Sequence, residues 1–404
     1  MRVALDLRWL QQACRNSPDG GLGGIAVFSR NLWIGLAEAR PGLDLVAILR
    51  EGPIPPALAA ILARAPGAQV LTVGPRGAFF SEARASRRLM ARHIETEWTR
   101  MRPLSRLGVD ILHRLDHTPP PRRADFATVV TVYDLIGLTD STPAGSLRQR
   151  LLRRYQHRHF GRISRAAAIA PISEATAGGL RERFPALADR MVVIPPGISN
   201  LAGGDALTRS TLLPAPPPGR YFLHVGLLTP RKNPEGLIQA LRRYVSAHGR
   251  DTALVCVGPY EANDGIRATI EETARRHDVA DLVHVLGAVP DVALGQLYCG
   301  AEALVFPSFD EGFGLPLVES LACGTPCVAS DSAVSREAAG PLAIYVDPCS
   351  SDSIAGGMVL AVSREHRSTV KREGPRWSGK YSLEAMAQQY IRLYTTCARA
   401  GGAK

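Results

Sequence analysis

Short apolar runs alternate along the chain with longer stretches in which apolar residues follow a helical period. After residue 24, for example, apolar residues at positions 25, 28, 32 and 36 recur at steps of three and four, which indicates one face of a helix. Strands that alternate with helices are typical of a parallel sheet covered on both faces. The predicted strands are 3–7, 45–49, 70–73, 111–113, 128–132, 167–171 and 191–194, then 221–225, 253–257, 283–286, 303–306, 326–329 and 343–346.

This alternation is interrupted once, near the middle of the chain, by a segment rich in glycine and proline. The segment predicts an α/β domain over 1–198, a linker over 199–219 and a second α/β domain over 220–376. The remaining residues, 377–404, include a helical pattern over 382–399. Because ligands of parallel sheets bind at the carboxyl ends of the strands, two such domains predict a cleft where their sheets face each other.

The composition excludes several classes of protein. Hydrophobic residues make up 46% and charged residues 21% of the 404 residues, which is ordinary for a globular protein and argues against disorder. No apolar run is long enough to span a membrane, and the charges of Asp6 and Arg8 argue against a signal peptide. We therefore expect a cytoplasmic protein.

Its seven cysteines, without a CxxC pair, predict thiols rather than disulfides or a zinc site.

The positive charge is concentrated in the first half of the chain. Residues 1–198 hold 28 arginines, no lysine and 16 acidic residues, a net charge of +12, whereas the remainder has a net charge of −1. This indicates an anionic partner. Two basic stretches, 81–108 and 148–165, favour either an anionic membrane surface or helices packed on their own sheet. Nucleic acid is disfavoured because no recognition motif is present.

The strongest chemical signal follows the predicted strand 303–306. Two acidic residues, Glu311 and Glu319, flank a loop with Gly312 and Gly314 that leads into a helix. Carboxylates accept hydrogen bonds from sugar hydroxyls, and the amide groups at a helix start favour a phosphate. A capped helix with a surface acid explains the two glutamates equally well on their own.

The wider context resembles a known family. The segment EGFGLPLVES at 311–320 resembles the signature of family-4 glycosyltransferases, which are retaining enzymes of the GT-B fold. HVGLLTPRKN at 224–233 is similar to the family's phosphate-contact segment, and CGTP at 323–326 and PPGI at 195–198 match further family segments. The resemblance implies two Rossmann-like domains that face each other across a cleft, with a C-terminal helix that crosses back to the first domain.

The resemblance also assigns roles to individual residues. Arg231 and Lys232 would hold the donor diphosphate, Glu319 the ribose, and Glu311 the transferred sugar. This is chemically reasonable, because fixed cations stabilise the charge of a leaving diphosphate. The remaining donor contacts implied by the family are Gly23, Gly24, Gly226, Gly312, Phe313, Gly314 and Leu315. Two alternatives stay open: packing for Phe313, and a dinucleotide-binding turn for the glycine pair 23–24.

The chain departs from the family pattern in two places. Tyr133, before Asp134, stands where many members have a histidine near the donor sugar, and its hydroxyl is the candidate replacement. We count Tyr133 and Asp134 among the candidate catalytic residues. His113 and His117 are either cleft residues or structural ones. Leu227 stands where many relatives have an arginine, which leaves Arg231 and Lys232 as the diphosphate-binding side chains of this segment.

The resemblance implies a retaining transferase that moves a sugar from a nucleotide diphosphate donor to a glycan or lipid-linked acceptor in cell-surface polysaccharide or glycolipid synthesis. The TPRKN-like branch makes mannose, from GDP-mannose, the first guess. No metal or other cofactor is expected, since the fold needs none and no DxD triplet is present. The alternatives are a nucleotide-sugar epimerase of similar fold and a non-catalytic relative that binds only nucleotide or membrane.

Overall fold

The structure, a computed structural model, divides the chain into two compact units. Unit 1 consists of Met1–Arg15, Ile25–Pro195 and Met386–Lys404, and unit 2 of Asn16–Gly24 and Pro196–Ala385. The described residues are 1–16, 22–73, 103–116, 118–121, 124–135, 160–199, 201, 219–260 and 263–401. His117, most of the linker predicted for 199–219 and most of the two basic stretches lie outside them.

Unit 1 is built on a parallel sheet. Among its described residues the strand order is β3-β2-β1-β4-β5-β6, and every pairing is parallel. This is the order of Rossmann-type sheets, in which the direction of winding reverses between the first and fourth strands. The strands are β1 (Arg2–Asp6), β2 (Asp44–Arg50), β3 (Gln69–Val73), β4 (Ile111–Arg114), β5 (Ala127–Val132) and β6 (Ala168–Pro171).

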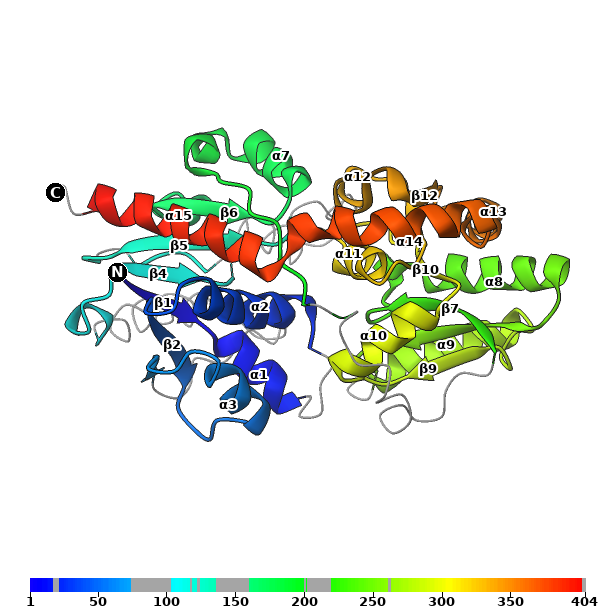
Figure 1. The fold of residues 1–404 in the computed structure, drawn as a ribbon, viewed down its shortest axis with the longest axis horizontal. Helices are drawn as coiled ribbons and strands as arrows, with labels where there is room; N and C mark the ends of the chain where they lie inside the picture. The colour runs from blue at the N-terminus through cyan, green and yellow to red at the C-terminus, as the bar shows by residue number, and fades with distance from the viewer. Residues whose placement is uncertain are drawn as a thin grey trace, which may run out of the picture. The chain divides into compact units, whose positions relative to one another are not determined.

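The helices of unit 1 come from both ends of the chain. They are α1 (Arg8–Asn16), α2 (Gly24–Ala39), α3 (Pro56–Leu62), α7 (Glu174–Arg183), the 3-10 turn η1 (Pro185–Arg190) and α15 (Leu383–Gly401). Helix α15 runs along the first sheet (Figure 1), where Tyr394 hydrogen-bonds the ring of His113 on β4 at 2.6 Å. Tyr390 lies 3.2 Å from the hydroxyl of Thr131 on β5. The expected return of the C-terminal helix to the first domain is confirmed.

Unit 2 repeats the same sheet. Within the part of the chain described, its order is β12-β11-β10-β7-β8-β9, again all parallel, which is the order of unit 1 read from the other edge. The strands are β7 (Arg220–Val225), β8 (Thr252–Val257), β9 (Val283–Leu286), β10 (Ala303–Phe306), β11 (Cys327–Ser330) and β12 (Ala343–Val346). Two Rossmann-like sheets, as the sequence predicts, are therefore confirmed.

Helices follow the strands of unit 2 as crossover connections (Figure 1). They are α8 (Pro234–His248), α9 (Asp264–Arg276), α10 (Asp291–Gly300), α11 (Leu315–Ala322), α12 (Ala333–Ala339), α13 (Ser351–Ala361), α14 (Arg364–Ser378) and the 3-10 turns η3 (Pro230–Lys232), η4 (Gly340–Leu342) and η5 (Gly379–Tyr381). Because helices cover both faces of a parallel sheet, its strands read as continuous apolar runs. Strand β8, for example, is buried at every position.

Two sequence expectations differ from the structure. The predicted strand at 191–194 is present only as an extended edge segment: Met191 forms an isolated bridge with Ile169, and Val192 and Ile194 donate to the carbonyls of Ile169 and Pro171 at 2.9 and 3.0 Å. Pro195 follows directly, so the pairing with β6 stays short. Helix α1 is absent from the predicted elements, which assign no structure to residues 8–16. Its buried side chains Leu10, Gln11 and Cys14 nevertheless form one helix face.

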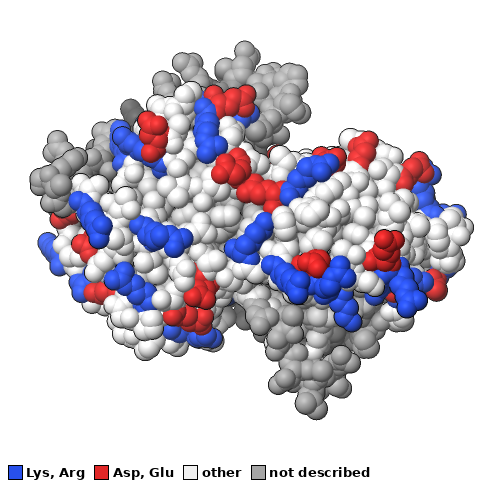
Figure 2. All heavy atoms as spheres, turned by 45° about the horizontal axis from the view of Figure 1, so that its top comes forward, with Lys and Arg blue, Asp and Glu red and all other residues white. Residues whose placement is uncertain are grey.

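The surface carries mixed charge. On the face drawn in Figure 2, basic and acidic side chains of the described residues are interspersed rather than gathered into one basic field. In the described part of the chain, no helix is both long and apolar enough to cross a membrane.

Candidate functional site

The candidate site lies where the winding of the second sheet reverses. Strands β7 and β10 are neighbours there, and the loops that leave their carboxyl ends begin at residues 226 and 307. Such a switch point opens a crevice at the carboxyl edge of a parallel sheet, which is the general ligand site of these folds. The two loops contact each other directly, since the amide of Phe309 donates to the carbonyl of Arg231 at 2.9 Å.

Three charged side chains predicted for the site meet at this point. Glu311 receives an ion pair from Arg231, with 3.1 Å between Nη1 and Oε2, and a second from Lys232 through its other oxygen. Lys232 also lies over the ring of Phe306, 4.3 Å from its centroid. Two cations on one carboxylate leave a net positive charge in the cluster. A further anion, such as a phosphate, would balance it.

Burial and ion pairing shift the pKa values of Glu311 and Lys232 in opposite directions. Burial raises the pKa of Glu311, but attraction from Lys232 and then Arg231 outweighs it, so the pKa falls and the carboxylate stays ionised. Burial lowers the pKa of Lys232, and Glu311 opposes that shift. The side chain of Lys232 is only 12% exposed, against 34% for Arg231. Arg231 is thus the more accessible of the two cations.

A short turn presents the two cations. The 3-10 turn Pro230–Lys232 ends at Asn233, which has a φ of 59° and caps α8 by accepting from the amide of Gly236 at 3.0 Å. Asparagine tolerates the left-handed conformation and is a good N-cap, so one residue ends the turn and starts the helix. Asn233 also donates to the carbonyl of Pro348 at 2.7 Å, which anchors the turn to the rest of unit 2.

Glycine is required in the loop after β7. Gly226 has a φ of 117° and lies against Gly258, where an added Cβ would come within 2.9 Å of the Gly226 backbone. Tyr260 fixes this close approach: its hydroxyl donates to the carbonyl of Gly226 at 3.0 Å and accepts from the amide of Leu228 at 3.3 Å. The loop that the family assigns to the diphosphate is therefore rigidly held.

The second acidic residue, Glu319, lies on α11 as the sequence predicts. It accepts a hydrogen bond of 2.7 Å from the hydroxyl of Tyr298 on α10. Burial, and then the charge of Glu319, raise the pKa of Tyr298 well above its usual range, so the hydroxyl remains a donor. The carbonyl of Tyr298 in turn accepts from Thr325 at 2.7 Å. Tyr298 thus orients Glu319, a role that no motif of the sequence indicates.

The loop between β10 and α11 is shaped by Gly314 and Phe313. Gly314 has a φ of 90° and precedes the first residue of α11, Leu315. Phe313 is buried, with its ring edge-on to Tyr381 at 5.2 Å between centroids, so its side chain packs within the unit. Gly312 lies between the paired Glu311 and this buried ring and is partly exposed.

His224, at the end of β7, lies behind the charged cluster. Its Nδ1 is 3.0 Å from the carbonyl of Val305, and its ring stacks on Phe306. Burial lowers the pKa of His224 to about 4, so the ring is neutral at pH 7 and Nδ1 carries the donated proton. The sequence does not predict the contact of His224 with Val305 and Phe306, because His224 lies on β7 and the other two on β10.

In the described residues, no group of three or more His, Cys, Asp or Glu side chains is placed to hold a metal ion. The cations of the candidate site are supplied by the chain itself, on Arg231 and Lys232.

Comparison with known proteins decides what kind of domain holds this cluster. Residues 213–377 match the family model described as "Glycosyl transferases group 1". Over these residues the chain resembles a group 1 glycosyltransferase domain. The match includes both candidate loops, so the charged cluster, Glu319 and Gly226 all lie inside the matched segment.

Curated relatives resemble part of the chain. The O-antigen chain mannosyltransferase B of Escherichia coli is 31% identical over 175 residues, 43% of this chain and 45% of that protein. The D-inositol 3-phosphate glycosyltransferase of Segniliparus rotundus is 29% identical over 237 residues, 57% of this chain and 52% of that protein. The chain thus spans about half the length of these relatives.

Solved structures resemble the chain over almost its full length. Sucrose-phosphate synthase from Thermosynechococcus elongatus has a TM-score of 0.74 at 19% identity, covering 99% of this chain and 100% of its own. WaaG, a glycosyltransferase involved in lipopolysaccharide biosynthesis, has a TM-score of 0.69 at 16% identity. The match covers 97% of this chain and 99% of the WaaG chain. The fold is that of GT-B glycosyltransferases.

The other candidate residues lie outside the glycosyltransferase domain match. Gly23 and Gly24 stand at the start of α2, with no atom within 4 Å of an added Cβ. Tyr133 follows β5 in unit 1, where it is buried and its hydroxyl donates to the carbonyl of Leu115 at 3.0 Å. Asp134 is partly buried beside it. The catalytic roles of Tyr133 and Asp134 stay predictions, as do the donor contacts of the glycines.

Proposed function

We propose that the protein is a retaining glycosyltransferase that moves a hexose from a nucleotide diphosphate sugar to a glycan or lipid-linked acceptor. The observation that carries the proposal is the cluster of Arg231, Lys232 and Glu311 at the switch point of a group 1 domain. Its two cations would stabilise the leaving diphosphate, and its carboxylate would accept from hydroxyls of the transferred sugar. Glu319, which accepts from Tyr298, would accept from the hydroxyls of the donor ribose.

The chemistry follows from these groups. The bond between the anomeric carbon and the diphosphate breaks with its electron pair on the diphosphate, through an oxocarbenium-like transition state. The acceptor hydroxyl forms the new bond on the same face, and its proton passes to an oxygen of the leaving diphosphate. Arg231 and Lys232 stabilise the developing negative charge. Because the acceptor attacks the anomeric carbon directly, the proposed step uses no protein nucleophile. Since the chain supplies these cations, we expect transfer to continue in EDTA.

Mannose is the proposed sugar and GDP-mannose the proposed donor. The support is the TPRKN segment at 229–233 together with the relative named as a mannosyltransferase in Escherichia coli. The proposed setting is cell-surface polysaccharide or glycolipid synthesis on the inner face of the membrane, where the basic stretches at 81–108 and 148–165 would meet anionic lipid.

Calorimetric titration with GDP, UDP, ADP and dTDP tests the donor site. We expect the wild type to bind one of them and Glu319→Ala to bind that nucleotide at least tenfold more weakly, because a charge-assisted hydrogen bond is lost. Glu272→Ala on α9 is the matched control. Glu272 is 57% exposed, and its ion pair with Arg275 lies within its own helix. Equal binding to the two variants, or no binding to the wild type, would refute the proposal.

A further inference from the structure

Two aromatic side chains near the end of unit 2 close the last turn of α12. The hydroxyl of Tyr381, in η5, donates to the carbonyl of Glu337 at 2.7 Å. Nε1 of Trp377, near the end of α14, donates to the next carbonyl, that of Ala338, also at 2.7 Å. The last carbonyls of a helix have no partner within the helix, so these two bonds satisfy groups that α12 leaves open. Both aromatic side chains are thereby fixed to α12.

The surroundings of the two rings hold them further. Gly340 has a φ of 55°, and an added Cβ would overlap the indole of Trp377, so only glycine leaves room for this ring. Nζ of Lys380 lies 3.3 Å from the centroid of the Trp377 ring and 4.9 Å from that of Tyr381, a cation–π contact with both. Burial raises the pKa of Tyr381 above its usual range, so its hydroxyl stays a donor.

The loop that follows β10 packs against these groups. The ring of Phe313, only 3% exposed, meets Tyr381 edge-on, with 5.2 Å between the centroids and 75° between the planes. Aromatic pairs favour this geometry because the positive edge of one ring faces the negative face of the other. Beside it, a Cβ added to Gly314 would lie 4.0 Å from the Cβ of Ala338. The residues that follow Glu311 are therefore packed against α12 and η5.

The backbone of Tyr381 is fixed as well. Its carbonyl accepts from the amide of Ile198 at 2.8 Å, and Ile198 forms an isolated parallel bridge with Ser382. The two segments approach closely, since a Cβ added to Gly197 would lie 3.0 Å from Cα of Leu383. Tyr381 is thus held by residues 197–198 at its backbone and by α12 at its hydroxyl, with its ring against the loop after β10.

This loop carries a residue of the candidate site. Glu311 stands two residues before Phe313, and its carboxylate is paired with Arg231 and Lys232. We propose that Tyr381 is a positioning residue for the transferred sugar: by holding Phe313, it sets where the carboxylate of Glu311 meets the sugar hydroxyls. Tyr381 acts through the loop and contacts no reacting atom. The inference rests on the proposed function, which assigns those hydroxyls to Glu311.

The inference separates the sugar from the rest of the donor. Glu319 is oriented by Tyr298, and the two cations lie on η3, which Asn233 anchors to the carbonyl of Pro348. None of these contacts includes Tyr381. Loss of the Tyr381 ring should therefore weaken binding of a nucleotide sugar and spare binding of the nucleoside diphosphate. A general loosening of unit 2 would weaken both.

Calorimetric titration of the full chain with GDP and GDP-mannose, and with UDP and UDP-glucose, measures both affinities. For the pair that the wild type binds, we expect Tyr381→Leu to weaken binding of the nucleotide sugar about tenfold and of the diphosphate by less than about threefold. Tyr381→Phe keeps the ring against Phe313, so it should show a smaller loss of the same kind.

Tyr345→Phe is the matched control. It removes a hydroxyl that donates to the carbonyl of Gly340, just after α12, while the ring of Tyr345 lies under the guanidinium of Arg336, 4.5 Å from the ring centroid. We expect this variant to bind the diphosphate and the nucleotide sugar as the wild type does.

Combining Tyr381→Leu with Phe313→Leu tests the path of the effect. If Tyr381 acts through Phe313, the double variant loses no more nucleotide-sugar affinity than the more impaired single variant. Three results would overturn the inference: no loss in Tyr381→Leu, an equal loss for diphosphate and nucleotide sugar, or losses that multiply in the double variant. Wild type that binds none of the nucleotides contradicts the proposed function itself, and the inference falls with it.

Discussion

Lys232 is the residue on which the proposed chemistry depends most directly. It is nearly buried, paired with Glu311 and seated over Phe306, so its ammonium group has a fixed position. A fixed charge stabilises a leaving group without reorganisation, which is the most effective form of electrostatic catalysis.

We expect Lys232→Ala to lower the transfer rate by about 10² to 10³, the loss found when one transition-state donor is removed. Lys232→Arg keeps the charge but not its compact shape, so it should recover part of the rate. Single-turnover kinetics with saturating donor would measure this. A variant whose rate matches wild type would show that the diphosphate is stabilised elsewhere. Arg242→Ala, which removes an exposed cation from α8, serves as the control.

Two buried histidines predict how stability depends on pH. Burial lowers the pKa of His113 to about 3 and of His224 to about 4, whereas both titrate near 6.5 in the unfolded chain. The unfolded state therefore binds more protons below pH 6.5, and stability falls as the pH is lowered through that value. At pH 5 each histidine should cost about 2 kcal/mol relative to pH 7.

Urea unfolding at pH 7 and pH 5 measures this loss. His113→Gln should destabilise the fold at pH 7, because it disturbs the bond to Tyr394, yet reduce the difference between the two pH values. An unchanged difference in this variant would contradict the assignment.

At the scale of elements, the start of α11 depends on one glycine. Gly314 has a φ of 90°, and an added Cβ would lie 3.2 Å from Leu317. We expect Gly314→Ala to cost about 1–2 kcal/mol, the penalty of the left-handed conformation for residues other than glycine. Because the same loop carries Glu311, nucleotide-sugar affinity should fall as well.

Gly356→Ala provides the opposite case. It lies inside α13 with no atom within 4 Å of an added Cβ, so alanine should stabilise this helix by about 0.5–1 kcal/mol. Thermal unfolding of both variants compares the two effects. A shift of the unfolding midpoint in the same direction for Gly314→Ala and Gly356→Ala would contradict these expectations.

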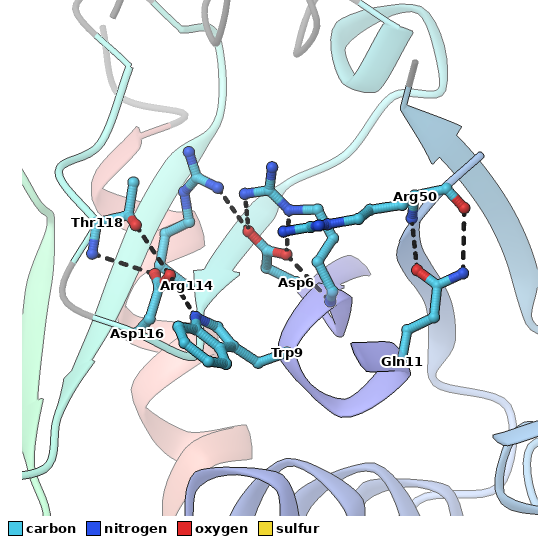
Figure 3. A network of polar contacts seen from close by, with 8 residues as sticks. Asp6, Trp9, Gln11, Arg50, Arg114, Asp116 and Thr118 are labelled. Atoms are coloured by element: carbon cyan, nitrogen blue, oxygen red, sulfur yellow. Dashed lines mark hydrogen bonds and ion pairs between the residues drawn. The ribbon is translucent and has the colours of Figure 1, made fainter. Parts of the chain in front are cut away.

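The sequence predicts the bounds of strands better than it predicts which strands, and which of their residues, lie side by side. Strands β9, β10 and β12 have the bounds predicted for them. Strand β10 is buried at every position, as the apolar run of a central parallel strand implies, whereas β9 is partly exposed throughout. The meeting of Lys232 with Glu311 needs the strand order, which no local pattern contains. The same holds for Asp6 and Arg114, 108 positions apart, whose pairing appears only when β1 and β4 are neighbours (Figure 3).

At the scale of the whole molecule, unit 1 is completed by residues from the end of the chain. Tyr390 and Tyr394 of α15 are fully buried against β4 and β5, and Phe28 of α2 meets Tyr390 edge-on at 6.2 Å. Residues more than 250 positions apart thus share one core.

Removing residues 386–404 should therefore unfold or loosen unit 1 while unit 2 stays folded. Loss of two buried tyrosines from a core costs about 3–5 kcal/mol each, by analogy with large aromatic truncations. Hydrogen exchange resolved by peptide would show deprotection in β4 and β5 with protection kept in β7 and β8. Uniform exchange through both units, or no change in β4, would contradict the expectation.

The contribution of α15 to unit 1 also bears on synthesis at the ribosome. Domains usually fold in the order in which they are made, the N-terminal one first. Here the stretch 196–385, nearly all of unit 2, is one continuous piece that precedes residues 386–404. Unit 2 can therefore finish folding before unit 1 gains its last helix. Until α15 is made, His113 and Thr131 lack the tyrosines that contact them in the folded protein.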